Sequence, residues 1–231
     1  MGLNRTNIQF VAEHNLLIGR LTMSAGVVGV KNSWAEMNVK VYPSINASYR
    51  FGDAWKVYAS YNTSLRMPSV TELFYSVGGH KADPNLKPEE LSAIEVGVKY
   101  NKKGLSGTVS SFYNHHTDLI DWIDDGEKDA AGAILWKSVN FGTINALGFE
   151  TTLNTDFRQL LPSQKLLKSF SVGYCFIQQH QIEAAGIHSL YALEYLKNKM
   201  TSSLQLNLWK ALDLNVNYRF QHRMGTYKDP S

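Results

Sequence analysis

Histidines and carboxylates are the side chains of this 231-residue chain that could hold a metal ion or move a proton. His115 and His116 are adjacent in a segment that reads as a strand. Successive side chains of a strand point to opposite faces, so these two imidazoles are not expected to share a metal ion. Five carboxylates form one acidic cluster, which could bind calcium through its oxygens or lie in a solvated loop. They are Asp121, Asp124, Asp125, Glu127 and Asp129.

Signs of catalysis and of nucleic-acid binding are missing from the sequence. It contains no nucleophile motif, phosphate-binding loop or zinc-ligand spacing. Cys175 is the single cysteine, so no intrachain disulfide can form. The formal net charge of +3 comes without a Lys/Arg-rich stripe, which argues against a nucleic-acid partner. We therefore expect no catalytic residues, no metal site and no cofactor, and a protein that is not an enzyme.

Polar and apolar residues alternate along much of the chain, which places most polar side chains on one face of each predicted strand. Between Tyr42 and Phe51, polar residues alternate with apolar ones, which is the pattern of a strand with one wet and one apolar side. The same alternation recurs along the chain and predicts about ten strands, many of ~10 or more residues, longer than the ~5–6 usual in globular proteins. We place them near 5–13, 18–31, 39–51, 54–66, 89–101, 104–123, 136–156, 167–180, 196–209 and 211–224.

The connections between these segments alternate between short and long. Short turns are expected at 51–54, 101–104 and 210–211, with an intermediate link at 158–165 on the same side. Long loops are expected at 66–88, 124–135 and 181–196. Outer-membrane barrels have this asymmetry, with short periplasmic turns and long outer loops, and they carry aromatic girdles. Suitable girdle residues lie near the turns and the loops: Phe51, Trp55, Tyr100 and Trp209, and Tyr61 and Tyr113.

The predicted fold class is all-β: a transmembrane antiparallel up-and-down β-barrel, with about ten strands that form part of a larger barrel. The longest apolar run, Ala25 to Val30, is far shorter than the ~20 residues of a membrane helix, and the N-terminus does not read as a secretory signal. Mean hydropathy is −0.24, but alternating strands average out as polar. The alternative is a soluble sandwich or lipocalin-like barrel.

Residues 55–100 resemble a motif block of TonB-dependent receptors. In that block an Arg-x-Pro segment ends a strand, and a Pro-Asn-Leu-Lys-Pro-Glu run precedes a strand with Glu-x-Gly. Met67 and Asp83 depart from it, and a second, weaker block follows at 140–150, after a strand-like segment at 113–120. The matching residues of the first block are Arg66, Pro68, Leu73, Tyr75, Pro84, Asn85, Leu86, Lys87, Pro88, Glu89, Glu95 and Gly97.

The resemblance leads to expectations about domain organisation, cellular compartment and activity that composition alone does not provide. It implies that residues 1–231 are a partial receptor barrel domain, about strands 10 to 19 of 22, with the plug domain and terminal strands absent. It implies a Gram-negative outer membrane, contact with its lipid, and TonB as a partner through the absent plug. The implied activity is binding and active import of a scarce nutrient: a corrinoid, an iron-siderophore or haem. The alternatives are a passive porin-type channel and a soluble β-rich binding module.

Five residues are candidates for contact with a ligand or a plug. Arg66 and Glu89 lie at the two ends of the loop between Pro68 and Pro88, where they either pair and close it or face a partner. The remaining candidates are His80, Glu95 and Arg50. Haem receptors of the resembled family are known for a histidine in the interval that holds His80. No metal ligand is predicted.

Overall fold

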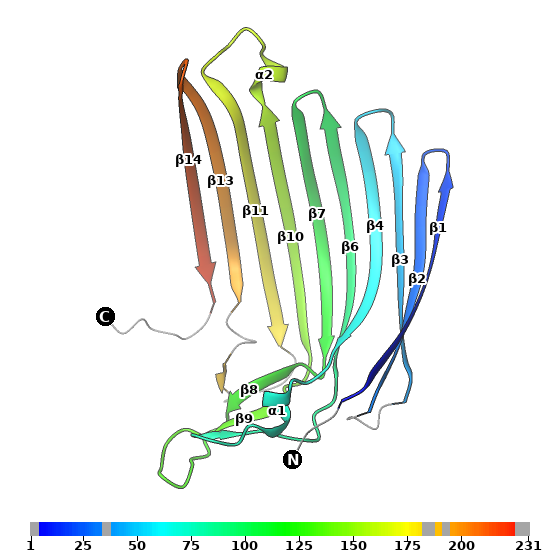
Figure 1. Ribbon diagram of the computed structural model, residues 1–231, viewed down its shortest axis with the longest axis vertical. Coiled ribbons are helices and arrows are strands. Elements are labelled where there is room, and N and C mark those ends of the chain that lie inside the picture. The colour runs from blue at the N-terminus through cyan, green and yellow to red at the C-terminus, as the bar shows by residue number, and fades with distance from the viewer. Residues whose placement is uncertain (1–4, 34–37, 182–187, 191–194, 225–231) are drawn as a thin grey trace.

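The computed structural model describes residues 5–33, 38–181, 188–190 and 195–224. Ten strands form one antiparallel sheet in which each strand pairs with its neighbours along the chain (Figure 1). This confirms the predicted all-β class and the number of long strands. They are β1 Asn7–Ile18, β2 Leu21–Asn32, β3 Lys40–Phe51, β4 Trp55–Arg66, β6 Glu89–Lys102, β7 Leu105–Thr117, β10 Ile144–Asp156, β11 Leu167–Gln181, β13 Leu196–Trp209 and β14 Leu212–Arg223.

Strand register gives the wall two different faces. Tyr58 lies opposite Gly97 on the next strand, and Lys56 lies opposite Lys99, so polar positions align across strands on what we call the polar face. Apolar positions align on the other, apolar face, where Trp55 and Val96 remain 51% and 52% exposed. A sandwich would bury such a face against a second sheet. The described residues place no second sheet on it, which counts against the sandwich alternative.

Turns and loops lie at opposite ends of the wall, as the sequence predicts. Short turns follow β1, β3, β6 and β13, and the short helix α2 (Phe157–Leu160) lies in the link after β10, at the same end (Figure 1). The predicted strand boundary at residues 13–18 was wrong, because the chain turns at Gly19 and Arg20. The polar residues at 13–15 resemble a loop in sequence, but they belong to β1. The turn lies at Gly19, which has the positive φ (57°) that the turn requires.

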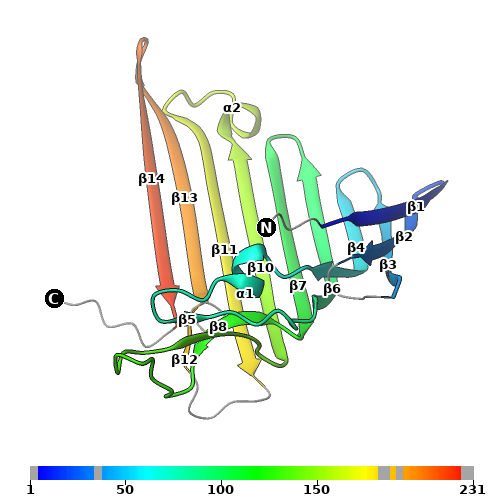
Figure 2. The same ribbon diagram turned by 60° about the horizontal axis from the view of Figure 1, so that its bottom comes forward.

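A second, smaller sheet lies at the long-loop end of the wall, and we call it the loop sheet. Its order is β12 (His188–Ser189), β8 (Ile120–Asp124), β9 (Trp136–Asn140) and β5 (His80–Lys81), beside the short helix α1 (Val70–Phe74) (Figure 2). The strands predicted at 104–123 and 136–156 were therefore too long. Each breaks where the backbone adopts a positive φ and leaves the wall, at Asp118 (50°) and Gly142 (94°).

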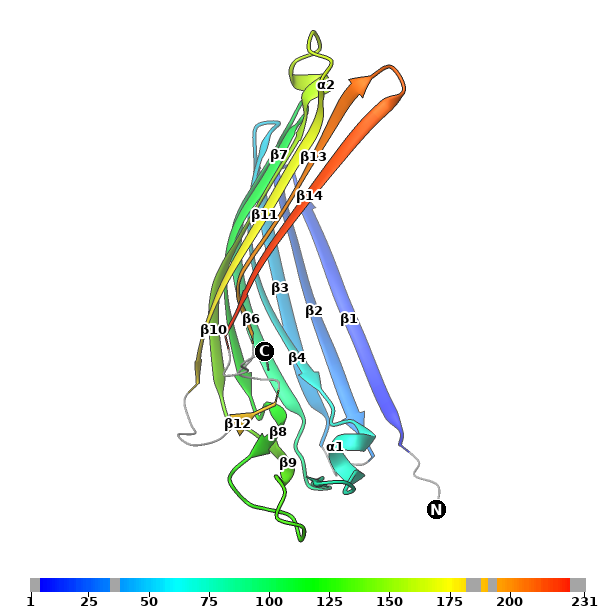
Figure 3. The ribbon, with the colours of Figure 1, turned by 90° about the vertical axis from the view of Figure 1, so that its left-hand side faces the viewer.

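The wall is an open arc. β1 and β14 end the sheet, and in the described residues they do not pair with each other (Figure 3). Aromatic rings line the apolar face beside the short turns, where the Trp55 and Tyr100 ring centroids are 4.7 Å apart and those of Tyr49 and Phe51 are 4.8 Å apart. Neither described helix has the length and apolar character needed to cross a membrane.

Candidate functional site

Arg66 joins three segments at the long-loop end of the wall. Its Nε donates to the Glu89 carboxylate at 2.9 Å, and one terminal nitrogen donates to the Glu72 carboxylate at 3.1 Å. The other terminal nitrogen donates to the backbone carbonyl of Ile120 at 3.1 Å. Of the two alternatives for Arg66 and Glu89, the structure shows the pairing, across directly opposed strand residues. The guanidinium fork lets this residue of β4 hold β6, α1 and β8 together.

The helix that Arg66 contacts is set by local sequence. Ser69 caps α1 by accepting from the Glu72 backbone N–H, and the Glu72 carboxylate accepts from the Ser69 N–H at 2.7 Å. This reciprocal capping box satisfies two backbone donors and fixes the start of the helix. On the inner side, Leu73 and Leu86 of the motif block are buried against Ile120. The block therefore builds a small core that positions the loop between Pro68 and Pro88.

Asn140 connects the two motif blocks. Its Oδ1 accepts from the Lys87 backbone N–H at 2.8 Å, and its Nδ2 donates to the Lys87 carbonyl at 3.0 Å. The same Nδ2 donates to the carbonyl of Asp118 at 2.7 Å, at the point where β7 leaves the wall. Sequence reasoning missed this contact, which spans 53 residues. The resemblance marked both blocks, but not that they touch.

His80 lies in an aromatic cluster at the start of the loop sheet. Its ring contacts Tyr75 and Trp122 edge-on, with centroids 5.6 and 5.2 Å away. The Nδ1 atom lies 3.2 Å from the Gly78 carbonyl. A carbonyl only accepts, so Nδ1 carries the proton in this contact. Tyr75 as a residue is 45% exposed, so a partly accessible aromatic side chain lies next to that imidazole.

The acidic segment is organised by a lysine. Lys137 Nζ lies 2.7 Å from the Asp125 carboxylate and 2.8 Å from that of Glu127. The hydrogen bond from Lys137 lowers the pKa of the Asp125 carboxyl below its ordinary value. Asp121 is buried and accepts from the Ser189 hydroxyl, which links β8 to β12. In the described ranges no three histidine, cysteine or acidic side chains are grouped in a way that could hold a metal ion.

The two adjacent histidines make separate contacts. His115 Nδ1 lies 2.6 Å from the Asn145 side-chain oxygen. His116 Nδ1 lies 3.6 Å from the Glu89 carboxylate and so extends the cluster around Arg66. Both residues belong to β7, whose alternation directs consecutive side chains to opposite faces.

Glu95 lies on the polar face, away from the loops. The Tyr58 hydroxyl donates to its carboxylate at 2.6 Å, and the Tyr58 ring lies across Gly97. A Cβ at that glycine would approach ring atoms to 2.6 Å, so the glycine makes room for the ring. Lys99 Nζ is 4.9 Å from the centroid of the same ring. The tyrosine thus contacts an anion and a cation that lie on either side of Gly97 on β6.

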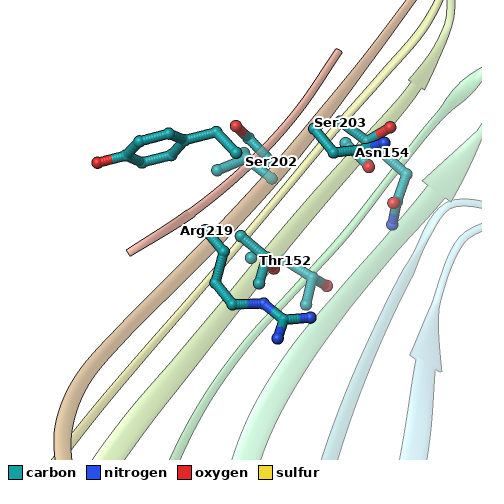
Figure 4. A pocket seen from close by; sticks show the side chains of 11 residues that line it. Thr152, Asn154, Ser202, Ser203 and Arg219 are labelled. Atoms are coloured by element: carbon teal, nitrogen blue, oxygen red, sulfur yellow. The ribbon is translucent and has the colours of Figure 1, made fainter. Parts of the chain in front are cut away.

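A hollow of about 500 Å³ opens among β10, β11, β13 and β14 (Figure 4). Hydroxyl and amide side chains line most of it, including Thr152, Asn154, Ser202 and Ser203, and Arg219 supplies a cation. Such a lining can hydrogen-bond a polypeptide or a polar ligand with little apolar contact. Sequence reasoning did not single out these residues, since short polar side chains recur on every strand.

The five predicted candidates fall in four places. Arg66 and Glu89 lie together beneath the loop sheet, and His80 lies within it. Glu95 lies partway along the wall beside Tyr58, and Arg50 lies at the short-turn end of β3. The structure therefore brings one pair together and separates the remaining three.

A family model described as "TonB dependent receptor-like, beta-barrel" matches residues 3–230. The chain belongs to the TonB-dependent receptor family. A curated member, the vitamin B12 transporter BtuB of Vibrio vulnificus, is 21% identical over 204 residues. That match covers 83% of this receptor chain and 30% of the relative. This chain therefore spans under a third of that TonB-dependent receptor's length.

Solved structures of other TonB-dependent receptors share the fold. The siderophore receptor PirA from Pseudomonas aeruginosa superposes with a TM-score of 0.70 at 17% identity, covering 94% of this chain and 38% of that one. A variant of the ferric enterobactin receptor PfeA from the same organism, in complex with enterobactin, also has a TM-score of 0.70, at 20% identity. That match covers 93% of this chain and 32% of the other. At these identities the likeness shows the fold.

Proposed function

We propose that the chain forms ten neighbouring strands of a larger barrel in an outer-membrane receptor that actively imports a scarce nutrient. The observation that carries the proposal is the family match over residues 3–230. The wall fits it physically, because its exposed apolar face suits lipid and its polar face suits a lumen. On this basis the plug domain and remaining strands belong to parts of the receptor outside residues 1–231.

The nutrient is proposed to bind at the long-loop end. Substrate classes for the full-length receptor are an iron-siderophore, a corrinoid or haem, and the proposed first contact is the cluster of His80, Tyr75 and the loop sheet. Two relatives support this range, since their names specify vitamin B12 and ferric enterobactin. Energy would reach the bound plug through TonB, and the outer membrane would be that of a Gram-negative bacterium.

The test is uptake by cells that carry the full-length receptor gene or a deletion of it. Radiolabelled cobalamin, ferric siderophores and haem are supplied separately, in strains with and without TonB. Saturable uptake of one class that requires both the receptor and TonB supports the proposal. Uptake that persists without TonB and does not saturate indicates a passive channel instead.

A loop variant then examines the proposed binding end. His80→Ala is expected to weaken uptake of the identified nutrient, while Lys165→Gln, at an exposed lysine in the link at the short-turn end of the wall, serves as the control. Equal uptake by both variants and the unaltered receptor would remove His80 from the proposed contact surface and leave the transport proposal intact.

A further inference from the structure

A hollow of about 430 Å³ lies at the long-loop end of β1, β2 and β3, and we call it the apolar groove. With the exception of one lysine, the described residues that line it are apolar. Phe10, Gly29 and Val41 cross it as a row of directly opposed residues, one from each strand. The register from β3 to β4 places this row on the face that carries Trp55, which is the apolar face of the wall.

The groove exists because Gly29 has no side chain. Its two opposed neighbours are large and exposed, at 67% for Phe10 and 60% for Val41. A Cβ added to the glycine would meet nothing nearer than the Phe10 Cβ at 3.9 Å, so no close approach requires glycine at this position. The gap between the two side chains remains open, and a hydrocarbon chain placed in it would gain van der Waals contact with both.

Lys31 lies at the outer end of the groove. It shares a face of β2 with Gly29 and is two residues further on, so the two positions are about 6.6–7 Å apart. Lys31 is ten residues from Leu21, where β2 leaves the turn, which is roughly 24–28 Å of height at the usual tilt of barrel strands. The apolar band of such barrels is about 25 Å tall, so the lysine ammonium lies at the level of the lipid headgroups.

None of the ion pairs formed by described residues includes Lys31. An ammonium at headgroup level attracts the anionic groups of lipids. A neutral hydrocarbon would fill the groove and leave the ammonium without an anion, and a free anion would leave the groove empty. A lipid that carries phosphate next to its acyl chains supplies both contacts in one molecule.

We propose that the apolar groove binds one phosphate-bearing lipid of the outer leaflet, with an acyl chain between Phe10 and Val41 and the phosphate at Lys31 Nζ. The rest of the apolar face contacts lipid without preference, whereas this groove selects a lipid by its charge. The inference rests on the proposed outer-membrane location, and not on which nutrient the receptor imports. Failure of the lipid test would leave the uptake proposal standing, and uptake without TonB would leave the groove standing.

Native mass spectrometry of the purified full-length receptor in detergent tests the proposal. The receptor is titrated with dioleoyl phosphatidic acid, or with dioleoylglycerol, which has the same chains and no phosphate. One phosphatidic acid per receptor is expected, bound more tightly than dioleoylglycerol. Lys31→Gln should weaken that binding about fivefold, since it removes one cation near the membrane surface. Lys102→Gln, at an exposed lysine of the short-turn end, should leave it unchanged.

A second pair of variants tests the acyl chain. Gly29→Leu fills the groove and should weaken binding of both lipids, whereas Ala59→Leu adds the same bulk to the apolar face outside the groove, opposite Val96. Equal affinity for the two lipids, equal effects of the two lysine variants, or equal effects of the two leucine variants would overturn the proposal. Receptor dimers that Gly29→Leu dissociates would also overturn it, because they assign the groove to a second copy. The lysine variants leave the packing of the groove intact, so they decide the outcome even if Gly29→Leu does not fold.

Discussion

Arg66 shows how one side chain can organise a whole loop. It ends a wall strand, yet its guanidinium reaches α1, β6 and the backbone of β8. Planar donors in a fixed fork suit this task, because two carboxylates and a carbonyl can be held at once. A lysine at this position would supply a point charge without the same fixed directions. The loop geometry near His80 therefore depends on a residue that need not touch any ligand.

Replacing Arg66 by glutamine is expected to loosen the segment from Ser69 to Pro88 while the wall stays folded. The side chain is 45% exposed, so solvent weakens the loss to about 1.4 kcal/mol, or roughly tenfold in local opening. Hydrogen exchange followed by mass spectrometry should show faster exchange in that segment and unchanged exchange in β6. Lys81→Gln is the control, and equal exchange in both variants would contradict the expectation.

Among the elements, β7 and β10 pack closely against each other in the middle of the wall. The Phe112 ring lies over Gly148, where an added Cβ would meet the ring at 2.4 Å and the Phe176 carbonyl oxygen at 2.5 Å. Ring atoms can rotate away, but a backbone carbonyl in a paired strand cannot move without disturbing the ladder. Glycine is thus required at this position by the approach of two neighbours, not by its φ angle.

Gly148→Ala is therefore expected to destabilise the wall by about 1–3 kcal/mol, the range typical of overpacking. Gly29→Ala is the matched control, because its added Cβ meets nothing nearer than Phe10 Cβ at 3.9 Å. The midpoint of urea unfolding in detergent micelles, followed by tryptophan fluorescence, measures both. A Gly148→Ala midpoint no lower than that of the control would show that the strands shift freely.

The sequence predicted the wall strands well and the loop sheet poorly, for a physical reason. Alternation identifies a strand wherever one face is wet and the other apolar, as in β3 and β14. Alternation does not register a break such as Asp118, since one residue with positive φ redirects the chain without changing the polar pattern. Among the site contacts, Arg66 with Glu89 was predictable from the flanking prolines. Asn140 with Lys87 was not, because nothing local connects them.

At the scale of the molecule, the wall leaves both an apolar face and two strand edges uncovered in the described residues. The exposed edges present rows of backbone donors and acceptors, and the exposed apolar face extends across many strands. Both features suit a protein surrounded by lipid and by further strands of a barrel. Both are unfavourable for a chain on its own in water.

The isolated 231-residue chain is expected to require detergent or to associate, and to transport nothing. Size-exclusion chromatography with light scattering, with and without detergent, measures its state in solution. Flux of a small solute into vesicles that contain the chain should equal that of empty vesicles. A monodisperse monomer in plain buffer would contradict the expectation.

The loop sheet takes its strands from three separate connections between wall strands. The connection from β4 to β6 supplies β5, the connection from β7 to β10 supplies β8 and β9, and the connection from β11 to β13 supplies β12. A residue inserted into any one strand shifts its register against the strand or strands that it pairs with, so the connections cannot lengthen or shorten independently. Over evolutionary time, a surface built in this way changes what it recognises mainly by exchanging side chains on a retained framework. Related receptors with different ligands should therefore differ less in the lengths of these strands than in the residues at their exposed positions.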